Sequence, residues 1–124
     1  CAADIDRLAS GIQQNILDQQ GEQASLQAIA SQGQQGQVNM AQFMTMKAQL
    51  LSYVTAGIAV RQNNQALLPT GNPATAGLAM VASAQQMELS LSSSLSGDPS
   101  IDMATIQTLQ GAFSGGIKQN MQNL

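Results

Sequence analysis

Apolar residues recur every three or four positions along much of the chain, a spacing that places them on one face of an α-helix. The first such segment spans residues 4–31, and Gly21 lies inside it as a candidate kink. Its stripe consists of Ile5, Leu8, Ile12 and Ile16. A second segment, residues 38–67, is apolar on almost every side, which is typical of a helix buried between neighbours. Its main face consists of Met40, Phe43, Leu50, Val54 and Ile58.

Two clusters of proline and glycine delimit the rest of the chain. Residues 69–73 form the first, in which Asn72 followed by Pro73 fits an N-cap with proline at the first helical position. A third segment then spans residues 73–95, and residues 97–99 separate it from a fourth at residues 99–124. The predicted stripe of the third segment is Gly77, Met80, Ala84, Met87, Leu91 and Leu95. That of the fourth is Ile106, Leu109, Phe113, Ile117, Met121 and Leu124.

These patterns predict an all-α fold, because no alternation of apolar and polar residues persists that would indicate strands. We expect a helical bundle of about four helices with short loops, forming a single domain over residues 1–124. Gly115 and Gly116 in the fourth segment predict a close helix crossing rather than a break. The residues expected to form the packing contacts or an interface are Phe43, Leu50, Val54, Ile58, Leu109, Phe113 and Ile117.

Charged residues are rare: they make up 9% of the chain, and the net charge is −3. The polar surface must therefore come from Gln, Asn, Ser and Thr, and weak charge repulsion favours association with other proteins. The four cationic residues are scattered, which argues against nucleic acid and against a polybasic membrane-binding patch. The uncharged stretch at residues 48–60 is too short to span a bilayer, which takes roughly 20 apolar residues.

Residues suited to catalysis are also few. The chain has no histidine and one cysteine, so a Cys/His metal site is excluded and the commonest general acid–base is missing. Asp18 and Glu22 lie four residues apart on one helix face, where we expect a solvated pair rather than a paired-carboxylate site. Asp98 and Asp102 lie at the start of the fourth segment, where capping explains them. We expect no catalytic residue, no metal and no cofactor.

The seven methionines have two interpretations. We expect them mainly in the core, where their flexible side chains fill irregular gaps. The alternative is a methionine-rich surface that makes adaptable contacts with other proteins. The scarcity of aromatic residues, 2% of the chain, argues against a ligand pocket.

The chain begins with Cys1, followed by Ala2 and Ala3. This start resembles mature bacterial lipoproteins, in which a signal peptide is cut before a cysteine that carries a diacylglyceryl group. The resemblance implies lipidation of Cys1 as the membrane contact, and Ala2 implies sorting to the outer membrane. Two other interpretations are open: Cys1 is the nucleophile of an N-terminal-cysteine amidohydrolase, or it is the first residue of a trimmed chain.

The glutamine-rich first segment, from Asp6 to Ile29, resembles the long helices of minor pilins from type IV secretion systems. This resemblance implies a non-enzymatic structural or adaptor subunit of a bacterial envelope or secretion assembly, similar to a conjugative pilus. Its partners would be other protein subunits, in a homo-oligomer or a multi-protein assembly, and its location periplasmic, cell-envelope or extracellular. The alternative is a small periplasmic lipoprotein that acts as a chaperone or inhibitor of a partner protein.

Overall fold

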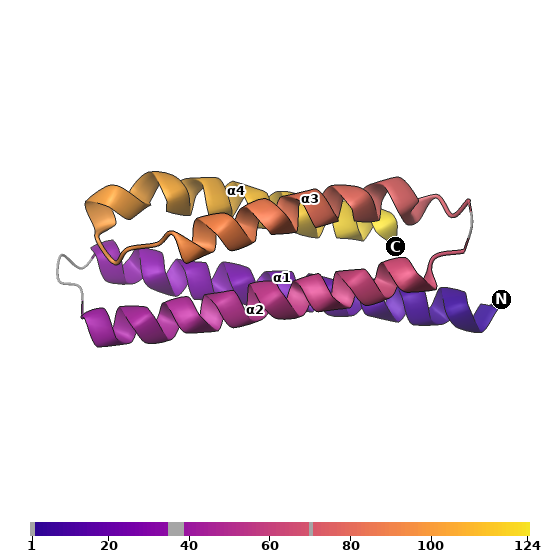
Figure 1. Ribbon diagram of the computed structural model, residues 1–124, viewed down its shortest axis with the longest axis horizontal. Coiled ribbons are helices and arrows are strands. Elements are labelled where there is room, and N and C mark those ends of the chain that lie inside the picture. The colour runs from indigo at the N-terminus through magenta and orange to yellow at the C-terminus, as the bar shows by residue number, and fades with distance from the viewer. Residues whose placement is uncertain (1, 35–38, 70) are drawn as a thin grey trace.

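The computed structural model describes residues 2–34, 39–69 and 71–124. Four helices follow one another: α1 (Ala2–Gln34), α2 (Met40–Leu67), α3 (Ala74–Ser93) and α4 (Pro99–Asn123). Over the described ranges there is no strand, so the prediction of an all-α bundle of four helices is confirmed. The helices run alternately up and down, with α1 and α3 each packed against α2 and α4 (Figure 1). α1 and α3 therefore face each other across the bundle diagonal.

Local side-chain chemistry determines where three of the helices begin. Asn39 caps α2 by accepting a hydrogen bond from the amide of Gln42, at 3.2 Å. Asp98 caps α4 through the amide of Ser100, at 3.0 Å, and Pro99 follows it at the first helical position. In α3 the helix begins at Ala74, whose amide donates to Oδ1 of Asn72 at 2.8 Å. Asn72 thus accepts a hydrogen bond from the first amide of the helix, as predicted for a capping residue. Pro73, however, precedes the helix instead of starting it.

Gly21 does not interrupt α1, which is continuous through this position. Its role is to admit the ring of Tyr53 from α2. A β-carbon placed on Gly21 would lie 2.5, 2.6 and 2.8 Å from three carbons of that ring, closer than real β-carbons approach other atoms. The glycine therefore allows close packing of α1 on α2 rather than a kink.

Two apolar clusters occupy the two ends of the bundle interior. The first lies at the α1–α2 connection and comprises Leu26, Ile29, Phe43, Leu50, Val54, Leu95, Leu109 and Phe113. The second lies toward the N-terminus of α1 and comprises Leu8, Ile12, Ile16 and Leu78. Each of these large side chains contributes about 1.5–3 kcal/mol when fully removed from water. Two clusters rather than one leave a stretch of interior between them that apolar residues do not fill.

The residues predicted to form packing contacts lie inside the chain's own core. Five of them are buried in the first cluster: Phe43, Leu50, Val54, Leu109 and Phe113. Ile58 is half-buried against that cluster, and Ile117 is half-buried against the second. Their side chains are therefore occupied by contacts within one chain.

The predicted stripe of α3 is right in part. Gly77 and Leu95 are buried and Leu91 packs against the first cluster, but Met80 and Met87 are exposed. The buried face of α3 is Ala74, Gly77, Leu78, Val81, Gln85, Glu88 and Ser92. The prediction placed the methionines inside, whereas α3 turns two long polar side chains inward. Ile5, Met40, Met121 and Leu124 were predicted to lie on the buried stripes of the other helices, but their side chains are exposed.

The double glycine of α4 combines one close contact with one open position. Gly116 is buried, and a β-carbon there would lie 2.7 Å from Nε2 of Gln19 in α1. Gly115 is exposed, and a β-carbon there would meet nothing within 4 Å. The predicted helix crossing therefore depends on Gly116 alone.

The two glycines offer a matched pair of substitutions. We expect Gly115→Ala to stabilise the chain by about 0.5–1 kcal/mol, because alanine favours the helix and meets no neighbour. We expect Gly116→Ala to destabilise it by about 1–3 kcal/mol, because the added methyl displaces the buried amide of Gln19. Urea unfolding of both variants measures the difference. Equal stabilisation by both would contradict the close contact at Gly116.

Candidate functional site

Between the two apolar clusters the interior is polar. Seven side chains fill this section, each 6% exposed or less, and we call them the polar layer: Asn15, Gln19, Glu22, Arg61, Gln85, Glu88 and Asn120. All four helices contribute, so the layer crosses the whole bundle. Buried polar groups destabilise a fold unless hydrogen bonds satisfy them. The partners of these side chains therefore decide what the layer can do.

Amide side chains hold one half of the layer together. Nδ2 of Asn120 donates to Oδ1 of Asn15 at 2.8 Å and to Oε1 of Gln19 at 3.1 Å. Nδ2 of Asn15 then donates to the carbonyl oxygen of Gly57 at 3.0 Å. This chain of bonds links α4 to α1 and α1 to α2.

The buried guanidinium of Arg61 is bound to amides rather than to a carboxylate. Its Nε donates to Oε1 of Gln85 at 3.0 Å, and its Nη1 donates to Oε1 of Gln65 at 3.0 Å. Burial lowers the pKa of Arg61 below its ordinary value. Within the described residues no ion pair joins Arg61 to Glu22 or Glu88.

Three members of the layer, Glu22, Glu88 and Gln85, have buried polar atoms without a partner among the described residues, and Nε2 is the atom concerned in Gln85. Both oxygens of Glu22 and Oε2 of Glu88 are buried with no hydrogen-bond partner among the described residues. The helical glycine Gly57 makes room for Glu22, because a β-carbon on Gly57 would lie 3.2 Å from Oε1 of Glu22. A β-carbon on Gly116 would lie 3.8 Å from Oε1 of Glu88, which is an ordinary contact distance.

The ionisation of these carboxyls is strongly perturbed. Burial raises the pKa of Glu22 to about 9, and repulsion from Glu88 and Asp18 acts in the same direction. Burial raises the pKa of Glu88 to about 7. The pKa of Asp18 is also raised by burial, against the opposing effect of a hydrogen bond from Gln14. Near neutral pH, Glu22 is therefore a neutral carboxylic acid and Glu88 is close to its midpoint.

The prediction of a solvated Asp18–Glu22 pair is wrong, since Glu22 is 0% and Asp18 only 9% exposed. The sequence signal that could have placed Glu22 inside is helical phase. In α1 the buried apolar residues stop at Ile16 and resume at Leu26, and Gln19 and Glu22 fill this gap at the same spacing. The same holds in α3, where Gln85 and Glu88 continue the series from Leu78 and Val81.

The outer surface carries a second unexpected feature. Six of the seven methionines are 46–61% exposed: Met40, Met44, Met80, Met87, Met103 and Met121. Met46 alone packs against the core. The expectation of mainly buried methionines is therefore wrong, because polar side chains occupy interior positions that methionines were expected to fill.

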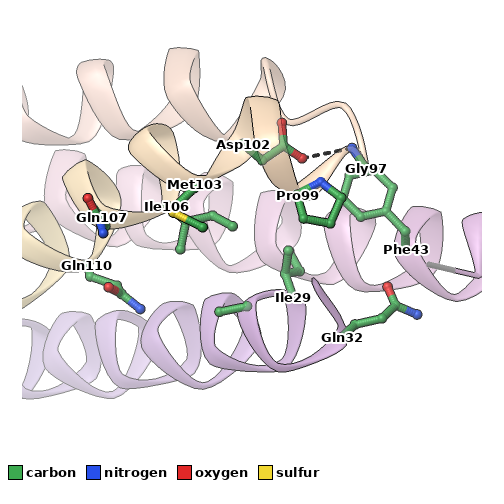
Figure 2. A pocket seen from close by; sticks show the side chains of 11 residues that line it. Ile29, Gln32, Phe43, Gly97, Pro99, Asp102, Met103, Ile106, Gln107 and Gln110 are labelled. Atoms are coloured by element: carbon green, nitrogen blue, oxygen red, sulfur yellow. Dashed lines mark hydrogen bonds between the residues drawn. The ribbon is translucent and has the colours of Figure 1, made fainter. Parts of the chain in front are cut away.

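A groove of about 340 Å³ lies at the end of the bundle near the first apolar cluster (Figure 2). Ile29 and Gln32 of α1 form one wall, and Met103 and Ile106 of α4 form the other. Phe43 and Pro99 close its end. The scarcity of aromatic residues argued against such a hollow, but one of the three aromatic side chains lines it.

Asp102 shapes the loop beside this groove. It is buried, and its carboxylate accepts bonds from the amide of Ser96 at 3.0 Å and from the amide of Gly97 at 2.8 Å. Gly97 has a φ of 91°, a conformation that favours glycine. Asp98 caps α4 as predicted, whereas Asp102 instead holds the preceding loop against the helix.

Other sites that the sequence raised are less informative. Cys1, the predicted lipidation site, lies outside the described residues. Over residues 2–34, 39–69 and 71–124 no three acidic, histidine or cysteine side chains are arranged to hold a metal ion. In the same ranges no helix combines the length and apolarity needed to cross a bilayer.

The chain matches no protein family, and the comparisons found neither a similar curated protein nor a similar solved structure. The case for a function therefore rests on the polar layer, the exposed methionines and the groove.

The contribution of the amide hydrogen bonds to stability can be tested at Asn120, which donates to two other amides of the polar layer. We expect Asn120→Ala to destabilise the chain by about 1–3 kcal/mol, because Asn15 and Gln19 each lose a buried hydrogen bond. Gln122→Ala is the control, since Gln122 is an exposed amide in the same turn of α4. Thermal and urea unfolding compare the two variants. A similar small effect of both substitutions would show that the buried amide bonds contribute little.

Proposed function

We propose that this chain is a non-enzymatic structural or adaptor subunit that binds other protein subunits through its outer surface. The observation that carries the proposal is the exposure of six methionines on a chain with only 9% charged residues. Methionine is flexible and polarisable, so a surface rich in it can adapt to different contours. Few surface charges mean little electrostatic resistance to association.

The distribution of the exposed apolar side chains supports contacts on more than one side. Met40 and Met44 belong to α2, Met80 and Met87 to α3, and Met103 and Met121 to α4. A one-to-one adaptor needs a single apolar face, whereas a subunit within an assembly contacts several neighbours. Ile5 and Leu17 of α1 are exposed as well, so exposed apolar residues lie on all four helices and fit the second arrangement better.

The position of the acidic groups favours a structural role over catalysis. Glu22 and Glu88 have strongly raised pKa values, which is a property of many catalytic acids. However, neither residue lines the groove between α1 and α4. A catalytic acid has to reach its substrate, and these two carboxyls are enclosed among four helices.

The cellular setting is a separate part of the proposal. A bacterial envelope or secretion assembly follows from the resemblance of the glutamine-rich first segment to minor pilins. Recovery of the native chain in a complex from an envelope fraction would test this setting independently of the surface contacts.

Replacing the six exposed methionines with glutamine tests the proposed surface. We expect the wild-type chain to gain mass with concentration in sedimentation velocity, and the six-fold variant to stay monomeric over the same range. Its stability should change little, because each replaced side chain is exposed. An always monomeric wild type, or a variant that associates equally well, would contradict self-association through the methionines.

Met46→Gln is the matched control, because Met46 lies in the same helix as Met40 and Met44 but packs against the core. We expect it to lower the free energy of unfolding by about 1–3 kcal/mol and to leave the association of the folded chain unchanged.

A further inference from the structure

We propose that the polar layer is a pH-sensitive switch in the bundle. The helices pack tightly around Glu22 and Glu88 when both are neutral carboxylic acids, and this packing loosens when both become ionised. The inference concerns the bundle itself and does not depend on the proposed assembly function.

The charges of the polar layer and of the neighbouring Asp18 do not balance when every group is ionised. α1 contributes Asp18 and Glu22, α3 contributes Glu88, and α2 contributes Arg61. α4 contributes no charge, because it faces the layer with the amide of Asn120 and with Gly116. The phenol of Tyr53, on α2, lies nearby against Gly21. Three carboxylates and one guanidinium would leave two uncompensated negative charges in the interior, a costly arrangement.

The hydrogen-bond geometry also favours the neutral acids. An ionised carboxylate requires several donors, yet both oxygens of Glu22 and Oε2 of Glu88 have none among the described residues. The guanidinium that could neutralise them is bound to Gln85 and Gln65. A proton is therefore the simplest way for the closed bundle to hold these side chains.

Repulsion between the two carboxylates would act across the bundle diagonal. Glu22 belongs to α1 and Glu88 to α3, and these helices pack on α2 and α4 but not on each other. Repulsion between the ionised carboxylates therefore acts to separate α1 from α3 across the bundle interior, rather than at one helix–helix interface. We expect swelling or cooperative opening of the polar layer, not a hinge between two rigid halves.

The sign of the pH dependence follows from the protons that the folded chain retains. In the unfolded chain a glutamate loses its proton near pH 4.5, whereas burial raises the pKa to about 9 for Glu22 and to about 7 for Glu88. Each retained proton makes the unfolding constant rise about tenfold per pH unit. The rise should be about a hundredfold per unit from pH 5 to 7 and about tenfold from pH 7 to 9.

The test is urea unfolding of the full chain from pH 4.5 to 9.5, together with the uptake or release of protons on unfolding. We expect the wild type to release about two protons per chain on unfolding near pH 6. Glu22→Gln should remove the pH dependence above pH 7, and Glu88→Gln should keep a tenfold slope up to about pH 9. The double variant should be nearly independent of pH. Asp6→Asn, at an exposed carboxylate, should behave as the wild type.

Two results would overturn the proposed pH-sensitive switch. An unfolding constant that stays flat from pH 5 to 9, without proton release, would show that the folded chain holds both carboxyls ionised. A double variant that keeps the slope of the wild type would assign the protons to other groups. Should the double variant fail to fold, the single variants assign the protons, because each should release about one proton fewer than the wild type near pH 6.

Discussion

Enclosing carboxyl groups inside a helical bundle is the constraint on which the rest of this structure depends. A buried ionised carboxylate costs several kcal/mol unless it is paired or protonated. Glu22 and Glu88 have no ion-pair partner among the described residues, which is why we infer that the fold is most stable where they hold protons. The absence of a side chain at Gly57 leaves space for Glu22. On this inference the centre of the bundle is sensitive to pH.

The polar layer also limits how the helices align. Asn120 can reach Asn15 and Gln19 together only when α4 lies in one register along α1, and a shift of one turn would separate these groups by about 5.4 Å. The apolar clusters on either side are less selective, since leucine and isoleucine tolerate small displacements. Polar contacts in the middle thus specify an alignment that apolar contacts at both ends stabilise.

Compared with an ordinary amphipathic bundle, this bundle has some polar side chains in its interior and some apolar side chains on its surface. Long polar side chains occupy the centre, and methionines lie on the surface of three helices. A free monomer gains nothing from exposed methionines, whereas a subunit can bury them against neighbours. Glu22 and Glu88 lie away from the groove, which is lined mostly by apolar and amide side chains together with Asp102. The exposed methionines support the proposal that this chain acts through contacts with other proteins.

The sequence by itself determined the four helices, because the 3.6-residue period, the Asp98–Pro99 start and the breakers around Pro69 and Gly97 act locally. It also identified much of the apolar core, including Leu50, Val54 and Phe113, whose burial follows from hydrophobicity alone. Only the tertiary structure decided which face of α3 turns inward, that Glu22 is buried, and that Gly116 rather than Gly115 meets α1. Helical phase carried a signal for the burial of Glu22, Gln85 and Glu88, but the polarity of these side chains opposed it, and the contacts with other helices decided the outcome. The difference between Gly115 and Gly116 depends on which side chain of α1 fills the adjacent space, and local periodicity does not contain that information.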